Sequence, residues 1–200
     1  MSYKIKLIDN CTIENRKYFF DANIWLMILK PKITPTPREQ KYLNFLERFK
    51  TSNQNPKIVI PSLVLSEVIN RYLRDVGMER YIKKKNIAKP TPPDFYKKQY
   101  RPSQEFKNDY QLLCDDINDF SVYYEFVSDQ LGDQITSEDV LLNPPKGLDF
   151  NDHYYYLLAK KENYIIVTDD ADFFVEDVDI LTNNITLYQK GKDSVLPKKA

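Results

Sequence analysis

The sequence is poor in glycine, histidine and cysteine. Only four of its 200 residues are glycine, and none of their spacings suits the usual dinucleotide or P-loop phosphate-binding motifs, which excludes both. The single histidine, His153, excludes catalysis by two histidines and a histidine-rich zinc site within one chain. Cys11 and Cys114 form no Cys-x-x-Cys pair, which argues against a disulfide framework or structural zinc. We therefore expect a reduced, cytoplasmic protein.

Long apolar stretches and an excess of one charge are also absent. The longest apolar run, 24–29, is far shorter than the ~20 residues that cross a bilayer, and the first residues lack the apolar core of a signal peptide. We expect no membrane insertion. Lys plus Arg and Asp plus Glu both number 29, so any binding of nucleic acid must depend on local charge.

The remaining composition is typical of one folded domain. Hydrophobic residues make up 42% and charged residues 29% of the chain, as in soluble globular proteins. A chain of this length can bury one core, so we expect a single domain over residues 1–200. Within it, residues from about 76 to 140 are rich in Lys, Tyr, Asp and Pro, and we interpret them as a helical insertion.

Elsewhere, short apolar segments alternate with segments of helical character. This alternation predicts an α/β fold, with a central, mostly parallel sheet covered by helices on both faces to give three layers. The predicted strands are 17–20, 57–60, 164–168, 178–181 and 185–188. The predicted helices are 22–29, 38–49, 61–74, 103–127 and 150–162.

Acidic residues follow several of these predicted strands. In parallel α/β sheets, ligands bind outside the carboxyl ends of the strands, and acids from four segments are expected there. Carboxylates gathered in one place repel one another unless a cation is present. Oxygen ligands favour Mg²⁺ or Mn²⁺ over zinc. The acids are Asp21, Glu67, Asp152, Asp169, Asp170 and Asp172.

Each acid also has a purely structural interpretation. Asp21 suits the N-cap of the helix that follows it, and Glu67 lies off the apolar stripe of its helix, where a solvated face is the usual environment. Asp149 and Asp152 have the spacing of a capping pair. If Asp152 only serves that cap, Asp149 replaces it in the site. The three acids after residue 168 also suit an ordinary turn.

Three segments resemble the PIN-domain nucleases, a family that includes the toxins of many bacterial toxin–antitoxin modules. They are residues 19–26 around the first acid, 60–68 around the second, and 152–173 around the rest. The last contains a strand-end Thr168 followed two residues later by Asp170, which matches the fourth acid of the family. The span between the second and third acids is longer than in compact PIN toxins.

The resemblance implies a metal-dependent endoribonuclease that leaves 5′-phosphate and 3′-hydroxyl ends. Asp21, Glu67, Asp152 and Asp170 would be the catalytic acids and would hold Mg²⁺ or Mn²⁺, with Asp172 as an alternate ligand. Asn23 would hold water or the scissile phosphate. RNA is the implied substrate, an antitoxin protein is a possible partner, and a homodimer is possible.

Cations should rim such a site, because acids repel phosphate. Arg71 and Arg74 beside Glu67 are the predicted substrate-binding cations, and further lysines and one arginine lie in the insertion. Tyrosines among them suit stacking of unpaired bases, although Lys-rich helices are usually just solvated and tyrosines are common in cores. We expect His153 to be exposed and incidental. The further residues are Lys83, Lys84, Lys85, Lys89, Lys97, Lys98, Arg101, Tyr81, Tyr96 and Tyr100.

Two other functions remain open. The chain could be an inactive PIN-like module that binds RNA or protein, or a structure-specific DNA nuclease with the same metal chemistry. A phosphatase with an Asp nucleophile is disfavoured, because the expected Asp-x-Asp after the first strand is Asp21-Ala22-Asn23.

Overall fold

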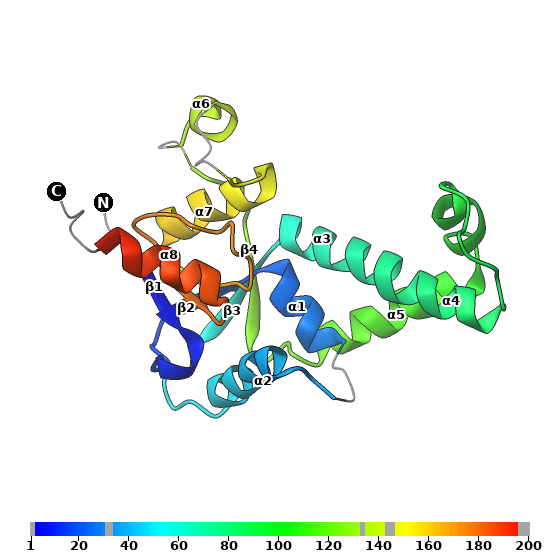
Figure 1. Cartoon of the computed structure of the whole chain (residues 1–200), viewed down its shortest axis with the longest axis horizontal. Helices are drawn as coiled ribbons and strands as arrows, with labels where there is room; N and C mark the ends of the chain where they lie inside the picture. The colour runs from blue at the N-terminus through cyan, green and yellow to red at the C-terminus, as the bar shows by residue number, and fades with distance from the viewer. Residues whose placement is uncertain (1–2, 31–33, 133–134, 143–146, 196–200) are drawn as a thin grey trace.

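A six-stranded sheet forms the centre of the computed structural model (Figure 1). The structure describes residues 3–30, 34–132, 135–142 and 147–195. The strand order is β1-β6-β5-β2-β3-β4, and every neighbouring pair is parallel, which confirms the predicted α/β fold with a parallel sheet. The strands are β1 (Lys4–Leu7), β2 (Lys17–Phe20), β3 (Lys57–Pro61), β4 (Tyr124–Val127), β5 (Ile165–Val167) and β6 (Asp179–Thr182).

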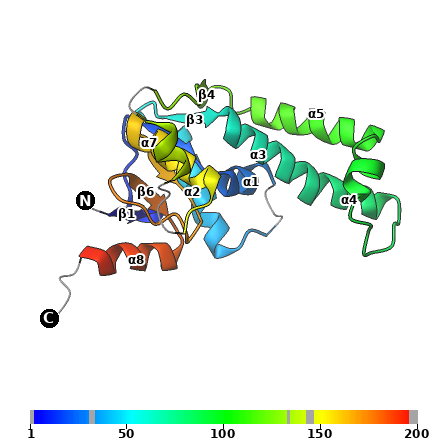
Figure 2. The same cartoon turned by 90° about the horizontal axis from the view of Figure 1, so that it is seen from above.

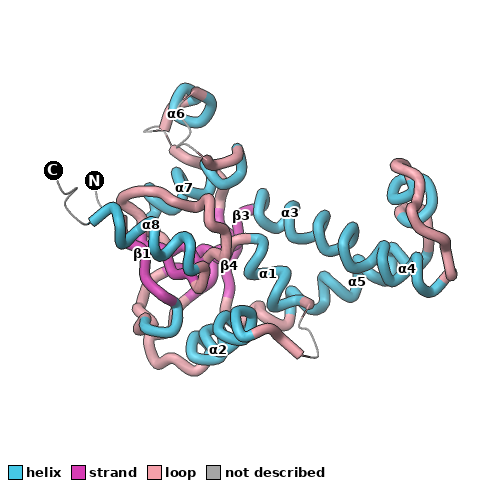
Figure 3. Tube along the Cα trace, viewed as in Figure 1, coloured by secondary structure: helices cyan, strands magenta, loops and turns pink. Residues whose placement is uncertain are grey.

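Helices surround this sheet (Figure 3). The α-helices are α1 (Ala22–Leu29), α2 (Pro37–Lys50), α3 (Ser62–Tyr72), α4 (Met78–Lys84), α5 (Gln104–Asn118), α6 (Ser137–Leu141), α7 (Phe150–Glu162) and α8 (Ile185–Val195). Shorter turns are the 3₁₀ turn η1 (Ile8–Asn10) and the π-helical turns η2 (Leu73–Gly77) and η3 (Tyr96–Tyr100). Among the described residues, no helix combines the length and apolarity needed to cross a membrane.

Alternating aromatic residues in β2 hold helices against both faces of the sheet. Successive side chains of a strand point to opposite faces. Phe20 packs on Phe45 of α2, with ring centroids 6.2 Å apart, whereas its neighbour Phe19 packs on Tyr155 of α7 at 4.9 Å. All four rings are buried. The central strand that carries the first acid is therefore clamped between two helical layers.

Two predicted elements are wrong. The helix predicted over 103–127 ends at Asn118, and residues 124–127 form β4, because they pair with β3 at the sheet edge. The residues interpreted as a helical insertion, about 76–140, therefore also contain a strand of the sheet. The strand predicted at 185–188 is the first turn of α8, where Asn184 Oδ1 accepts a hydrogen bond from the Leu187 N–H at 3.2 Å, as an N-cap does. Strand β1 was not predicted.

The helices between β3 and β4 form an arm that projects from the sheet (Figure 2). We call residues 62–118 the arm. Helix α3, turn η2 and helix α4 follow one another directly over 62–84, which at 1.5 Å per residue is a helical rod of roughly 34 Å. Helix α5 returns beside this rod, and a five-residue connection leads from it into β4.

Aromatic rings fill the far end of the arm. Tyr100 is fully buried, and the rings of Tyr81 and Tyr96 lie 5.5 and 5.7 Å from it. Stacking of RNA bases on Tyr100 is therefore a wrong prediction, because its ring belongs to the arm's own core. The Tyr100 hydroxyl donates to Asp109 at 2.7 Å, and Asp109 pairs with Arg80 at 2.9 Å.

Gly77 makes this packing possible. A Cβ atom at Gly77 would lie 2.0 Å from the Tyr100 hydroxyl oxygen, so Gly77→Ala should destabilise the protein by about 1–3 kcal/mol, the usual cost of overpacking. Urea denaturation measures the change. In a Tyr100→Phe background the same substitution should cost less, because the clashing oxygen is gone. Equal costs in both backgrounds would contradict this packing.

Candidate active site

Asp21 lies at the carboxyl edge of the sheet, where β2 and β5 end side by side. Phe20 is paired with Val167, and the Asp21 N–H donates to the Val167 carbonyl at 3.0 Å. This register places Thr168 next to Asp21, and the Thr168 hydroxyl donates to Asp21 Oδ2 at 2.6 Å. Asp21 is only 5% exposed. The sheet therefore fixes a carboxylate in a buried position.

The Asp21 side chain does not cap the helix that follows it. Asp21 occupies the N-cap position of α1, but its carboxylate makes no capping hydrogen bond. Instead, the Asn23 amide donates to Asp21 Oδ2 at 2.5 Å, and Asn23 Oδ1 accepts from the Asp169 N–H at 3.2 Å. The capping interpretation of Asp21 is thus wrong for the side chain, and Asn23 bridges the ends of β2 and β5.

Glu67 reaches this region from the second turn of α3. Its carboxylate is partly buried, and it accepts hydrogen bonds from the Tyr155 hydroxyl at 3.1 Å and from Asn151 at 3.4 Å. Both partners lie on α7. Arg71 makes an ion pair with the other carboxylate oxygen at 3.4 Å. Glu67 therefore connects α3 to α7 and is not on an open solvated face.

Asp152 lies in the first turn of α7, facing the other acids. Burial raises its pKa to about 8, with smaller contributions from the negative charges of Asp21, Asp149, Asp170 and Glu67. These carboxylates are therefore close enough to influence one another. Asp149 caps the helix by accepting from the Asp152 N–H at 2.9 Å, as the spacing predicts, which leaves the Asp152 carboxylate available to the site.

Burial also raises the pKa of Asp21, to about 6. The Thr168 hydrogen bond lowers this pKa, whereas the charges of Glu67 and Asp170 raise it. The hydrogen bond thus offsets part of the cost of burying the carboxylate, and the neighbouring acids add to that cost. Asp21 and Asp152 consequently have a reduced tendency to ionise in the metal-free protein.

The turn after β5 supplies Asp170 and Asp172. The Asp170 N–H donates to the Thr168 hydroxyl oxygen at 3.0 Å, and the Asp172 N–H donates to the Asp170 carboxylate at 2.8 Å. Asp172 itself is largely exposed, with its carboxylate 3.9 Å from Lys190 Nζ. Asp170 is therefore half-buried and connected through Thr168 to Asp21, whereas Asp172 is exposed, and the participation of both in the site stays a prediction.

The donor set suits a hard divalent cation. The atoms gathered here are carboxylate oxygens with hydroxyl and amide groups beside them, and such oxygens are the preferred ligands of Mg²⁺ and Mn²⁺. A cation would also favour the charged form of Asp152, whose pKa is raised first by burial and then by the neighbouring negative charges. In the part of the chain that the structure describes, no three Asp, Glu, His or Cys side chains form a ligand shell.

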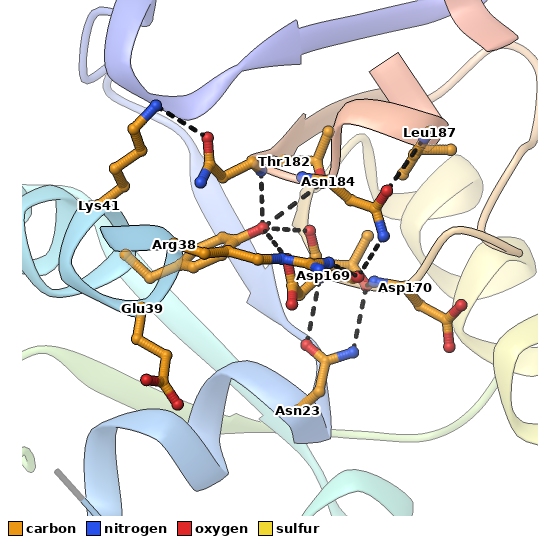
Figure 4. A network of polar contacts seen from close by, with 12 residues as sticks. Asn23, Arg38, Glu39, Lys41, Asp169, Asp170, Thr182, Asn184 and Leu187 are labelled. Atoms are coloured by element: carbon orange, nitrogen blue, oxygen red, sulfur yellow. Dashed lines mark hydrogen bonds and ion pairs between the residues drawn. The ribbon is translucent and has the colours of Figure 1, made fainter. Parts of the chain in front are cut away.

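A buried tyrosine supports the site from behind. The Tyr42 hydroxyl donates to the Thr168 carbonyl at 3.0 Å and lies 2.8 Å from the Asp169 carboxylate. It also accepts from the Asn183 N–H at 2.7 Å. Figure 4 shows Arg38 on the same side, where its Nε is 2.6 Å from Asp169 Oδ1. Asp169 is therefore held by α2 and does not face the acidic cluster.

Sequence reasoning missed Tyr155, Asn151, Tyr42 and Arg38. Their partners lie between 84 and 141 residues away along the chain, so no local pattern marks them. The prediction that His153 is exposed is wrong: it is 2% exposed, and its Nε2 lies 2.7 Å from the Asp139 carbonyl oxygen. It packs α7 against α6.

An open hollow of about 880 Å³ lies elsewhere on the same sheet edge, where β3 and β4 end. The four predicted catalytic acids do not line it. Asp129 lines this hollow and accepts a hydrogen bond from the Ser62 N–H at 2.9 Å. The acidic cluster, rather than this hollow, is therefore the candidate active site.

Comparison with known proteins identifies the family. The fold is a parallel α/β domain that carries acids at the carboxyl edge of its sheet. The family model of the PIN domain matches residues 18–177 of this chain. The chain therefore belongs to the PIN domain family, whose members are nucleases. This match spans both the acid that follows β2 and those that follow β5.

Two solved structures are similar over most of the chain. VapBC2 from Rickettsia felis, solved bound to a DNA fragment from its promoter, is 14% identical, with 83% of this chain and 98% of that chain covered and a TM-score of 0.46. PAE2754 from Pyrobaculum aerophilum is 13% identical, with 88% and 89% covered and a TM-score of 0.45. A search of curated proteins gives no match.

The raised pKa of Asp152 predicts that stability depends on pH. Its folded pKa of about 8 lies above an unfolded value of roughly 3.9, so stability should fall as pH rises from about 4 to about 8 in EDTA. Asp152→Asn should stabilise the protein at pH 8.5 by about 1–2 kcal/mol, because one pKa unit corresponds to about 1.4 kcal/mol and solvent screens the exposed part.

Thermal unfolding at pH 5 and pH 8.5 measures this effect. Asp193→Asn is the control, because Asp193 is an exposed carboxylate on α8. Mn²⁺ should stabilise the wild type at pH 8.5 and should stabilise Asp152→Asn less. If Asp152→Asn and Asp193→Asn gave the same pH profile, the crowding of acids around Asp152 would be refuted.

Tyr42→Phe should destabilise the protein while leaving the acids in place. The substitution leaves the Asn183 N–H and the Thr168 carbonyl without the hydroxyl they contact. An unsatisfied buried group costs about 1–3 kcal/mol, which urea denaturation would show. Tyr188→Phe is the matched control, because that tyrosine is partly exposed on α8. An equal, small effect of both substitutions would contradict the role given to Tyr42.

Proposed function

We propose that this protein is a metal-dependent endoribonuclease that hydrolyses RNA phosphodiester bonds with Mg²⁺ or Mn²⁺. The observation that carries the proposal is the buried carboxylate of Asp21, which Thr168 connects to the Asp170 backbone through hydrogen bonds of 2.6 and 3.0 Å. Two further acids support it: Glu67 accepts hydrogen bonds from α7, and the pKa of Asp152 is raised to about 8, first by burial and then by the charges of nearby acids. Membership of a nuclease family supports hydrolysis, and the choice of RNA follows from the resemblance to toxin-type PIN ribonucleases.

The chain's own residues would hold and orient the reactants. Asp21, Glu67, Asp152 and Asp170 would bind the cation, with Asp172 as an alternate ligand. When bound, a divalent cation lowers the pKa of water and stabilises negative charge on a phosphate. Thr168 keeps Asp21 in one orientation by donating at 2.6 Å, which reduces the rearrangement needed on binding.

Neutral and basic groups around the acids would position the substrate. Asn23 bridges Asp21 and the Asp169 backbone, and its amide would hold a water or the scissile phosphate beside Asp21. Arg71 lies 3.4 Å from Glu67, and Arg74 lies three residues further along the arm, where both side chains are exposed. These cations would reduce the repulsion between the acidic cluster and phosphate.

A toxin role is the more specific form of the proposal. The resemblance to toxin-type PIN domains supports it and makes an antitoxin protein the partner to seek. Growth after induced expression is the direct test: the wild type should arrest growth, whereas Asp21→Asn at the same expression level should not. Unimpaired growth with active wild-type enzyme would oppose the toxin role and leave the nuclease in place.

The nuclease is tested with purified protein and a mixed RNA pool in Mn²⁺, Mg²⁺ or EDTA. Cleavage should require a metal, and Asp21→Asn should reduce its rate at least about 100-fold, because loss of a catalytic electrostatic group commonly costs about 10²–10³. Asp193→Asn, the same chemical change on the exposed face of α8, should retain the rate. Products should carry 5′-phosphate and 3′-hydroxyl ends.

Other outcomes would point to the other functions. Cleavage of DNA flaps in preference to RNA would identify a structure-specific DNA nuclease. A folded protein that binds RNA and is stabilised by Mn²⁺, yet cuts nothing with any ion, would be a binding module. Cleavage that persists in EDTA, or in Asp21→Asn, would contradict the proposed acidic site.

A further inference from the structure

Positive charge is concentrated in one part of the arm. Residues 71–107 contain eleven Lys or Arg and four Asp or Glu, a net charge of +7, although the whole chain is neutral. The remaining residues therefore carry a net charge of −7. Such a separation produces a strong local field even where the net charge is zero. The far part of the arm is a basic surface on a protein whose candidate active site is acidic.

Several of these cations have no acidic partner. Lys83, Lys97 and Arg101 are exposed, and among the described residues they form no ion pair. Other lysines nearby are partly neutralised: Lys84 and Lys85 pair with Glu105, Lys89 with Glu79, and Lys98 with Asp94. The unpaired cations lie on α4, on η3 and directly after η3, so the helical rod and the connection that leads to α5 both contribute to the basic surface.

A row of cationic side chains along the arm leads from Glu67 toward this surface. Glu67 pairs with Arg71 one turn further along the arm, at 3.4 Å. Arg74 follows on the same helix face, because residues seven apart are two turns apart. The Arg74 guanidinium lies over the Tyr96 ring, 5.6 Å from its centroid. The residue after Tyr96 is Lys97, one of the cations without an acidic partner. A polyanion at Glu67 could thus follow cations outward along the arm.

Residues 71–107 of the arm offer charge and few exposed rings for base stacking. Tyr100 is buried in the arm's core, and its two partly buried tyrosine neighbours are covered by cations: Arg74 over Tyr96, and Lys85 over Tyr81 at 5.9 Å. Contacts to phosphate need only exposed charge and carry no sequence information. The Tyr100 and Asp109 hydrogen bond and the roughly 34 Å helical rod hold these charges at a fixed distance from the site.

We propose that residues 71–107 of the arm bind the phosphate backbone of the RNA, outside the acidic site and without base preference. This inference rests on the proposed function, since it names where the substrate is held while one of its phosphates lies among the carboxylates. Attraction between the RNA phosphates and the cations of the arm compensates for the repulsion between a phosphate and the carboxylates of the acidic site. The arm therefore sets a minimum length of RNA that binds tightly.

The test measures binding without cleavage. Fluorescence anisotropy would follow a labelled 20-nucleotide oligouridylate in EDTA, with Asp21→Asn in every protein. One variant carries Lys83→Gln, Lys97→Gln and Arg101→Gln. The matched control carries three Lys→Gln substitutions at exposed positions on β1 and α8, far along the chain from the arm: Lys4, Lys6 and Lys192.

The arm variant should bind the oligonucleotide at least about tenfold more weakly at 0.1 M salt. The slope of log binding constant against log salt concentration should fall in magnitude by about 2, because each lost phosphate contact on a single strand removes roughly 0.7. The control should keep most of its affinity and slope, and circular dichroism should show all proteins folded. An oligoadenylate of equal length should bind within about threefold of the oligouridylate.

Equal losses in the arm variant and the control would overturn the proposal, because binding would then follow net charge alone. Polyglutamate that competes as well as RNA at equal charge would also overturn it and would assign the arm to an acidic protein. Wild-type protein that binds RNA through the arm but cuts nothing in Mn²⁺ would support the arm and refute the nuclease. Metal-dependent cleavage that the arm substitutions leave unchanged would support the nuclease and refute the role of the arm.

Discussion

Mutual repulsion among carboxylates at one edge of a parallel sheet is the constraint on which the rest of the structure depends. The sheet brings these groups together because β2 and β5 end in register. Their surroundings make the crowding tolerable: Thr168 donates to Asp21, Tyr155 donates to Glu67, and Arg71 pairs with Glu67. Burial and neighbouring charge still raise the pKa of Asp152 to about 8, so the fold retains a site whose electrostatic energy a cation would lower.

Much of this arrangement could be predicted from sequence, because the central strands and their acids are adjacent along the chain. Asp21 directly follows β2, and the N-cap position of Asp149 is a local pattern. The register of the outer strands is different. Strand β4 exists because it pairs with β3 at the sheet edge, far away in sequence, and no residue within 124–127 indicates that partner. The roles of Tyr42 and Tyr155 likewise depend on long-range packing.

The arm shows the limit of reasoning from composition. Its lysines and tyrosines, taken together, suggest charge with stacking rings, but the structure separates these two features. Tyr100 lies inside the arm, with its hydroxyl on Asp109, and the lysines remain outside. A tyrosine among lysines is ambiguous in sequence, because only burial decides whether its ring is a core residue or a binding platform. His153 presented the same ambiguity, and packing against α6 resolved it.

The arm begins directly after β3 and returns through α5 into β4, its neighbour in the sheet. Its two ends are therefore pinned beside each other by strand pairing. Such a hairpin can be lengthened or shortened by whole helical turns, about 5.4 Å each, without shifting the sheet register or moving the acids after β2 and β5. The reach of the arm beyond Glu67 and the geometry of the acidic site are thus encoded in separate stretches of the chain, and each can change while the other stays constant.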